Sequence, residues 1–326
     1  MILPKCNKCG KKFDSLQALN DHFRKVHPSE RFVAPKTNAT KNLTIGLVIV
    51  IIVIGSLVGY LIYMQEQQSS TTNTNESLLG QVISTGVYNN LTGVSDTTLA
   101  SIGSYSGASS PTSITGTPLV GYGKPLILYI GADWCPYCAA ERWAMIVALS
   151  KFGTFSGLTY MASSPTDSYA NTPTFSFYNS NYTSQYVTFV AVEYQDRLRN
   201  PLQTISQNES ALMTQYDSSQ TIPFVDFANQ YLVNGAQFSP PLISNLNWSQ
   251  ITSQLNNPNS GVAKAIDGSA NKLITAICKI DGGNPSSVCG KSYANITLSL
   301  IPKHTGQSSF EINTVRKDPA LGIEKL

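Results

Sequence analysis

The chain has 326 residues, which is enough for one large domain or two ordinary ones. Its formal net charge of +3 is unevenly distributed, because residues 1–42 contain nine of the 22 basic residues and only three of the 19 acidic ones. The first 42 residues therefore carry a net charge of +6 and the remainder −3. This difference excludes a protein whose surface charge is the same throughout. We expect the two regions to have different surroundings.

Residues 6–27, CNKCGKKFDSLQALNDHFRKVH, follow the pattern Cys-x2-Cys-x12-His-x4-His. Two thiolates on a tight turn and two imidazoles one helical turn apart can bind a zinc ion tetrahedrally. Phe13 and Leu19 would form the small core of a unit that needs the metal to fold. The predicted ligands are Cys6, Cys9, His22 and His27.

This pattern resembles the C2H2 zinc finger family at every position, so residues 1–35 are predicted to be a ββα finger that binds Zn2+. In DNA-reading fingers, the helix positions that face bases would here be Ser15, Ala18 and Asp21. None of these is the Arg or Asn that makes strong bidentate base contacts. We therefore expect contacts with a cytoplasmic protein or with lipid, and no sequence-specific binding of nucleic acid.

Residues 43–64, LTIGLVIVIIVIGSLVGYLIYM, form an apolar run of 22 residues without a charge. About 20 apolar residues cross the bilayer core as a helix. The run predicts a single transmembrane helix, within a region 36–64 that also holds the juxtamembrane segment. Basic residues precede the run and none follows before Lys124. The positive-inside rule then predicts a cell-membrane protein with a cytoplasmic N-terminus and an extracellular C-terminal domain.

Residues 65–118 are rich in Ser, Thr, Asn and Gly, which is typical of a stalk. We expect the stalk to reach about Asn75, with short elements of an N-terminal extension over 76–92 and 94–104. From about residue 119 to residue 326 the apolar content is that of a globular domain.

In this domain PLILYIG (125–131) is a continuous apolar run, typical of a buried parallel strand. Apolar spacing then predicts a helix over 136–151. The order of elements predicts an α/β fold with a mixed sheet, flanking helices and an inserted hairpin. The remaining predictions are a strand over 158–162, hairpins 174–178/186–194 and 223–228/230–233, and helices 205–216, 248–256 and 262–279.

Four further cysteines follow the predicted span, on the side where disulfides persist. Cys278 ends a predicted helix and Cys289 follows a turn, so this pair is predicted to form a structural disulfide. An alternative is a second zinc ion bound by all four cysteines. The ten residues between Cys278 and Cys289 argue against it, because half of a zinc site has closer ligands.

Cys135 and Cys138, in GADWCPYC, lie between the predicted buried strand and the helix that follows it. The dipole and free N–H groups at a helix N-terminus favour a thiolate, so Cys135 is predicted to be nucleophilic. Cys138 lies one turn deeper, where it can attack a mixed disulfide and release the partner. The pair is therefore predicted to be redox-active.

The strand, the WCPYC motif, the helix and a later Thr-Ile-Pro-Phe (221–224) resemble the thioredoxin superfamily over about residues 119–260. The resemblance implies that Pro223 is a cis-proline facing the cysteine pair, beside which a substrate strand could bind. It also implies that residues 119–326 are a thioredoxin-like domain with a C-terminal helical extension. WCPYCAAERW and the membrane layout further resemble an archaeal family of membrane-anchored, thioredoxin-like proteins of unknown function.

The sequence departs from that superfamily behind the cysteine pair. Thioredoxins often bury an acid six residues before the first cysteine, where this chain has Tyr129. The proton of Cys138 would then need another acceptor, for which Glu141, Asp133 and water are the candidates. The intervening Pro-Tyr resembles glutaredoxins. No histidine lies between the cysteines, as it does in the strongest oxidants, and this leaves the direction of the reaction open.

These features predict a membrane-anchored, extracytoplasmic thiol–disulfide oxidoreductase that acts on protein thiols and disulfides and exchanges electrons with an unknown membrane partner. The alternative is a non-catalytic thioredoxin-fold binding protein that signals across the membrane to the cytoplasmic finger. A third hypothesis, a regulator released from the membrane to bind DNA, needs a cleavage step for which the sequence shows no signal.

Overall fold

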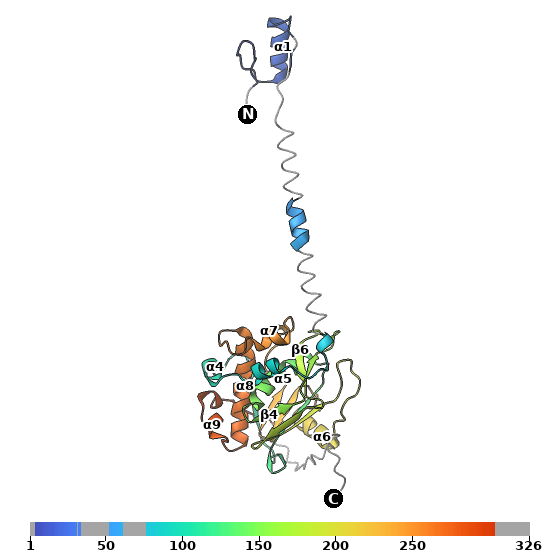
Figure 1. Cartoon of the computed structure of the whole chain (residues 1–326), viewed down its shortest axis with the longest axis vertical. Helices are drawn as coiled ribbons and strands as arrows, with labels where there is room; N and C mark the ends of the chain where they lie inside the picture. Colours follow the sequence, from blue (N-terminus) through green and yellow to red (C-terminus); the bar gives the residue numbers. More distant parts are fainter. Residues whose placement is uncertain (1–3, 31, 34–51, 61–75, 304–326) are drawn as a thin grey trace. The chain divides into compact units, whose positions relative to one another are not determined.

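The computed structural model describes residues 4–30, 32–33, 52–60 and 76–303 (Figure 1). The chain divides into two compact units, a smaller unit of residues 1–70 and a larger unit of residues 71–326. The stalk predicted up to Asn75 lies outside the described residues.

The smaller unit contains helix α1 (Leu16–Val26), which begins where the Ser15 side chain accepts a hydrogen bond from the N–H of Ala18 at 3.1 Å. The hairpin predicted before the helix consists of a single antiparallel bridge between Lys5 and Lys12. The sequence predicted Phe13 and Leu19 as core residues of this unit but not Phe23 and Phe32. The core is Cys6, Leu19 and Phe23, with Phe13 and Phe32 packed against it.

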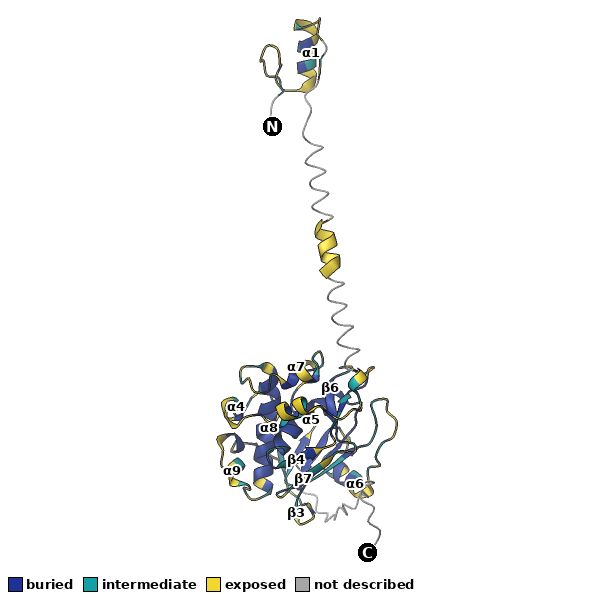
Figure 2. Cartoon of the chain, in the orientation of Figure 1, coloured by how far each residue is buried: buried dark blue, intermediate teal, exposed yellow. Residues whose placement is uncertain are grey.

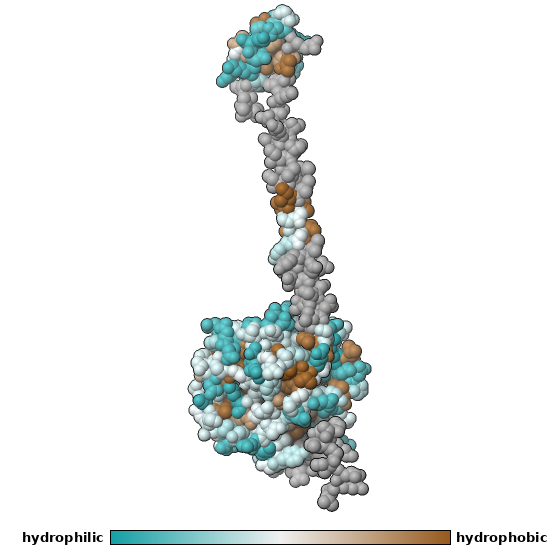
Figure 3. Space-filling view, viewed as in Figure 1, coloured by the Kyte–Doolittle hydropathy of each residue, from teal (hydrophilic) through white to brown (hydrophobic). Residues whose placement is uncertain are grey.

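The transmembrane helix predicted over 43–64 is wrong for the part of the chain that the structure describes, where no helix is long and apolar enough to cross a membrane. Of that run the structure describes residues 52–60, a helical segment with exposed side chains, several of them apolar (Figures 2 and 3). The other residues of the run lie outside the described ranges. The predictions of a membrane anchor, a cell-membrane location and an extracellular domain are corrected with it.

The larger unit is built on a mixed sheet in which strand β3 (Lys124–Gly131) has partner strands along both edges. β3 pairs in parallel with β8 (Thr188–Glu193) along one edge and antiparallel with β9 (Phe224–Phe227) along the other. The α/β class with mixed pairing is therefore confirmed. The sheet is completed by β2 (Val120–Gly121) beside β3 and by β10 (Tyr231–Asn234), β1 (Thr112–Ile114) and β11 (Ser299–Lys303) beyond β9.

The hairpin predicted from 174–178 and 186–194 is wrong. β6 (Pro173–Ser176) instead pairs with β5 (Thr159–Ala162) in a separate two-stranded sheet, while β8 joins β3. The buried β3 needs a hydrogen-bonding partner on each edge, and this requirement outweighs the local turn signal between the two segments. A second small sheet pairs β4 (Gly153–Ser156) with β7 (Asn181–Ser184).

The second predicted hairpin is confirmed by the antiparallel pairing of β9 with β10. Its turn consists of Ala228 and Asn229, which have φ angles of 53° and 61°. Two successive positive φ angles are the signature of a type I′ turn, whose twist matches that of the flanking strands.

The predicted helices are present with somewhat different ends, and two short ones form the predicted N-terminal extension. Their bounds are α3 (Thr85–Thr92), α4 (Asp96–Ile102), α5 (Pro136–Leu149), α6 (Gln207–Tyr216), α7 (Trp248–Thr252), α8 (Gly261–Ile280) and α9 (Ser286–Cys289). The larger unit also contains two 3-10 turns, Pro240–Leu242 and Ser292–Ala294.

Two hydrophobic cores lie on the two faces of the sheet, because successive side chains of a strand point to opposite faces. Ile127 and Tyr129 belong to the larger core, together with side chains of α5 and α8. Leu126, Leu128 and Ile130 belong to the smaller core, together with side chains of α6. Helix α5 is buried along nearly its whole length (Figure 2), so the residues at its N-terminus are held by packing.

Trp143 of α5 is central to the larger core. Its side chain is fully buried, its Nε1 donates to Pro173 O at 2.8 Å, and its ring lies 4.6 Å from that of Phe175. We predict that Trp143→Ala lowers the free energy of unfolding by about 3–5 kcal/mol, because it leaves a cavity and an unpaired carbonyl. All three tryptophans lie in the larger unit, so fluorescence during urea unfolding reports on this unit alone.

The matched control for this measurement is Leu198→Ala, since that side chain is 68% exposed. It should change the free energy of unfolding by less than about 0.5 kcal/mol. Equal losses in the two variants would contradict the central place of Trp143 in the core.

Candidate functional site

The cysteine pair lies where β3 gives way to α5. Cys135 is the N-cap of α5, with φ −79° and ψ 120°, and Pro136 follows as the first helical residue. The backbone N–H of Cys138 donates to Cys135 Sγ at 3.2 Å. Both residues are free thiols, and they are 3% and 0% exposed. The sulfur of Cys135 thus takes the role of a capping oxygen at the positive end of the helix.

The surroundings shift the pKa values of the two thiols in opposite directions. The hydrogen bond from the Cys138 thiol lowers the pKa of Cys135, and the Cys138 backbone N–H and the charge of Arg142 lower it further. Complete burial raises the pKa of Cys138 well above its ordinary value, and its hydrogen bond to Cys135 acts in the same direction. This asymmetry favours the thiolate at Cys135 and the thiol at Cys138.

Pro223 lies beside the pair. The Ile222–Pro223 peptide bond is cis and directly precedes β9, the antiparallel neighbour of β3. The carbonyl oxygen of Ile222 lies 4.0 Å from Cys135 Sγ. The structure therefore brings together Pro223 and the two cysteines, which are far apart in the sequence.

Behind the pair lies a group of charged residues that sequence reasoning largely missed. Arg142 donates from Nε to Glu193 Oε1 at 2.8 Å and from Nη2 to Glu193 Oε2 at 2.7 Å. Its Nη2 also lies 3.5 Å from Asp133 Oδ1. We call Asp133, Arg142 and Glu193 the buried charge cluster, because none of the three is more than 1% exposed. A usable signal was present, since Arg142 and Glu193 interrupt otherwise apolar segments.

The two candidate proton acceptors lie in different surroundings. Burial raises the pKa of Asp133 to about 7, the negative charge of Glu193 raises it too, and the charge of Arg142 opposes both. Burial also raises the pKa of Glu141 to about 8. Glu141 Oε2 accepts from the N–H of Gln237 at 2.9 Å, and its Oε1 has no hydrogen-bond partner. Asp133 Oδ1, by contrast, lies 3.5 Å from Arg142 Nη2.

Aromatic side chains lie at and near the mouth of the site. Tyr137, between the two cysteines, is 44% exposed and packs edge-on against Tyr169 with ring centroids 6.0 Å apart. Trp134, directly before Cys135, donates from Nε1 to Gln195 at 2.9 Å. The guanidinium of Arg199 stacks on the Trp134 ring at 3.8 Å. Polypeptide approaching Cys135 would meet this aromatic surface.

The smaller unit contains a second candidate site, formed by the four predicted metal ligands. One ligand atom from each of these residues lies within 4.8 Å of the others, and Cys9 Sγ lies 3.2 Å from His22 Nε2. His27 Nε2 is buried without a hydrogen-bond partner, which is consistent with its being a metal ligand. Cys6, Cys9, His22 and His27 could therefore bind a metal ion.

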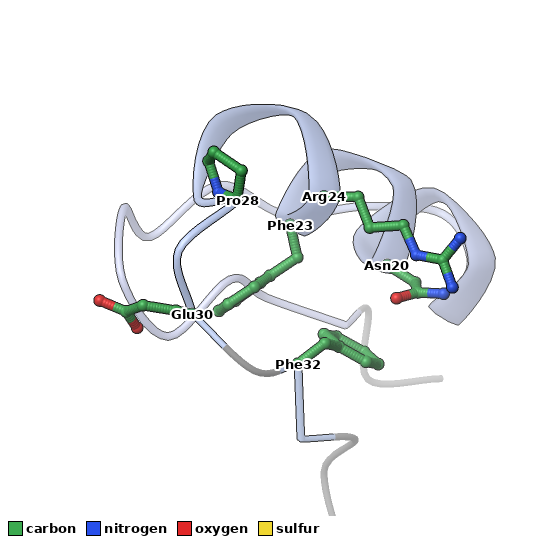
Figure 4. A pocket seen from close by; sticks show the side chains of 6 residues that line it. All are labelled: Asn20, Phe23, Arg24, Pro28, Glu30 and Phe32. Carbon is green, nitrogen blue, oxygen red and sulfur yellow. The ribbon is translucent and has the colours of Figure 1, made fainter.

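A hollow of about 420 Å³ lies beside α1 in the same unit (Figure 4). Phe23 and Phe32 form one part of its wall, and their rings are 5.5 Å apart. Asn20 and Arg24 from α1 and Glu30 from the following segment supply polar groups. Glu30 is also paired with Lys8 at 3.0 Å.

Cys278 and Cys289 are joined by a disulfide, with Sγ atoms 1.91 Å apart. The bond links the end of α8 to α9. It leaves Cys135 and Cys138 as the free thiols of the larger unit's described residues.

One comparison with known proteins gives a result. A family model described as "Domain of unknown function (DUF929)" matches residues 110–279, which include β3, the cysteine pair and the buried charge cluster. Neither a curated protein nor a solved structure matches the chain.

Glu141 provides a pH-dependent test of the site's surroundings. Its pKa is about 8 in the folded protein against an ordinary 4.5, so the folded state keeps a proton that the unfolded chain releases. The stabilisation is complete below about pH 4.5 and is lost as the pH rises through 8. Relative to Glu141→Gln, the wild-type free energy of unfolding should fall between pH 5 and pH 8, by up to about 1.4 kcal/mol per pH unit.

Urea unfolding followed by tryptophan fluorescence at several pH values measures this difference. Other buried acids titrate in both proteins, so they cancel when the two profiles are subtracted. Parallel profiles would mean that the Glu141 carboxyl keeps its ordinary pKa.

Proposed function

The chain belongs to the DUF929 family, whose description states no function, and from the geometry of its cysteine pair we propose that the larger unit is a thiol–disulfide oxidoreductase acting on proteins. The observation that carries the proposal is the position of Cys135 at the N-cap of α5, with its sulfur accepting the N–H of Cys138 at 3.2 Å. A thiolate there is stabilised by the helix end, and a second thiol one turn deeper can resolve what it forms.

In the proposed reaction the Cys135 thiolate attacks one sulfur of a protein disulfide. A bond forms between Cys135 Sγ and that sulfur, and the other substrate sulfur leaves as a thiolate that takes up a proton. Cys138 then loses its proton and attacks Cys135 Sγ, which releases the second substrate sulfur as a thiol. Two electrons pass from the cysteine pair to the substrate, and the pair becomes a disulfide.

The same steps run in reverse when the pair starts as a disulfide and the substrate as a dithiol. The direction depends on the reduction potentials of the pair and of its partner. The low pKa of Cys135 favours its role as the attacking group and, in the reverse direction, as the leaving group.

A thioredoxin-like arrangement is part of this proposal. Strand β3 leads through the WCPYC motif into α5, and the cis Pro223 opens the antiparallel β9–β10 hairpin. The backbone of Ile222 beside Cys135 Sγ would give an extended substrate segment groups to pair with. The aromatic side chains of Tyr137 and Trp134 would contact residues flanking the substrate sulfur.

We also propose that the smaller unit binds Zn2+ through Cys6, Cys9, His22 and His27. Two thiolates and two imidazoles suit zinc better than calcium or magnesium, which prefer oxygen ligands. The core beside the ligands consists of few side chains, so the metal would supply folding free energy. We propose that this unit contacts another protein at the hollow beside α1, where Phe23 and Phe32 lie beside polar side chains.

The redox proposal predicts that Cys138→Ala accumulates mixed disulfides through Cys135, because the resolving thiol is missing. The purified variant is incubated with a disulfide-containing protein such as insulin, and non-reducing electrophoresis with mass spectrometry identifies the adduct. Cys135→Ala is the matched control and should trap nothing. If Cys138→Ala forms no adduct and the wild type exchanges no disulfides, the proposed function is wrong.

The metal proposal predicts one zinc ion per chain by native mass spectrometry of the full chain. Cys9→Ser should lower the affinity by more than about 100-fold, because even residues that only support metal ligands contribute 10- to 100-fold. Cys135→Ser is the matched control, since it is the same change outside the ligand set and should keep the zinc. Equal zinc content in the two variants would contradict the predicted ligands.

A further inference from the structure

The buried charge cluster is connected to the cysteine pair by a shared hydrogen-bond acceptor. The carbonyl oxygen of Ala132 accepts from Arg142 Nη2 at 2.8 Å and from the N–H of Cys135 at 3.2 Å. Arg142 also lies one helical turn beyond Cys138 on α5. The guanidinium is thus held against the backbone that positions the Cys135 sulfur.

The position of the guanidinium is determined by Glu193. The two residues form a bidentate pair of hydrogen bonds, which fixes the plane of the guanidinium. Glu193 is the last residue of β8, in parallel register with Gly131 at the end of β3. The carboxylate is therefore carried by the sheet, next to the strand that leads into the cysteine motif.

Part of the arginine's hydrogen-bonding capacity is unused. Arg142 Nη1 is buried and has no hydrogen-bond partner, although such a group is costly to leave unpaired. Asp133 lies only 3.5 Å from Nη2 and is two residues before Cys135. The charge of Arg142 lowers the pKa of Cys135, as expected of a cation and a sulfur in a buried site with a low dielectric constant.

Two carboxyl groups lie beside the one guanidinium of the cluster. Glu193 pairs with Arg142 at 2.7 Å, and Asp133, whose pKa burial raises to about 7, lies 3.5 Å from the same Nη2. A Cys135 thiolate and an Asp133 carboxylate are therefore two anions that compete for one arginine.

The other titratable groups around the pair do not add a competing buried charge at neutral pH. The pKa of Tyr129 is raised well above its ordinary value by burial, and burial raises that of Tyr194 to about 12. Tyr137 also has a raised pKa. Asp196 and Arg199 are charged but lie at the exposed side of the site.

We propose that Arg142, positioned by Glu193, stabilises the thiolate of Cys135, and that Asp133 competes for the same guanidinium and so controls the reactivity of the pair. All three are positioning residues, since none of them contacts a substrate. The inference deepens the proposed function and rests on it for its biological meaning, while the charge effect itself concerns only this chain's own groups.

The test is the pKa of Cys135, measured from the pH dependence of its alkylation by iodoacetamide in the reduced full chain, with mass spectrometry identifying the modified residue. Asp133→Asn removes the competing anion and should lower the pKa of Cys135 by at least about 0.5, a roughly threefold change in the thiolate ratio. The double variant Arg142→Gln/Glu193→Gln removes the cation without leaving a buried charge, and it should raise the pKa by a similar amount.

Glu141→Gln is the matched control. It is also a change of a buried carboxyl to an amide, on the same helix but outside the cluster, and it should leave the pKa of Cys135 unchanged. Tryptophan fluorescence verifies that each variant is folded. If the double variant fails to fold, Asp133→Asn decides alone.

Shifts of opposite sign in the two cluster variants would support the proposal, since a general loosening of the site would shift both in one direction. An unchanged pKa in Asp133→Asn, or shifts of the same sign in both, would overturn it. Alkylation needs no substrate. A failure here therefore leaves the trapping result for Cys138→Ala intact, and a failure to trap leaves the measured shifts intact.

Discussion

The larger unit depends on one constraint, the burial of β3 (Lys124–Gly131) on both faces of the sheet. From Leu126 to Ile130 its side chains are completely buried, between α5 and α8 on one face and α6 on the other. A buried strand cannot leave its N–H and C=O groups unpaired, so both of its edges need a partner strand. β8 and β9 meet this need, one parallel and one antiparallel.

The same pairing assembles the candidate site at the C-terminal end of β3. The register places Gly131 opposite Glu193 of β8 and Ile130 opposite Phe224 of β9. Glu193 thereby reaches Arg142, and the carbonyl oxygen of Ile222, two residues before Phe224, lies 4.0 Å from Cys135 Sγ. Residues from three separate segments thus meet at one point, because β8 ends and β9 begins beside the end of β3.

Placing the buried charge cluster at the end of β3 costs free energy of folding. Two buried charges lose their hydration, and a well-packed apolar pair of similar volume is often as stable or more stable. The bidentate hydrogen bonds between Arg142 and Glu193 offset part of this cost. The position of the buried charge cluster behind the two thiols is more consistent with control of their ionisation than with a contribution to stability.

The metal ligands and the cysteine pair could be predicted because their geometry is local: both follow from spacing along one turn or helix. The order of helices followed from periodicity for the same reason. The sequence could not predict that β8 pairs with β3, or that Arg142 contacts Glu193, 51 residues away. Hydrophobic patterns indicate which residues are buried but not which strands pair. The transmembrane helix predicted over 43–64 was wrong for the residues that the structure describes. The sequence by itself determined the metal-ligand pattern and the cysteine pair. The register of the strands decided which buried groups surround that pair.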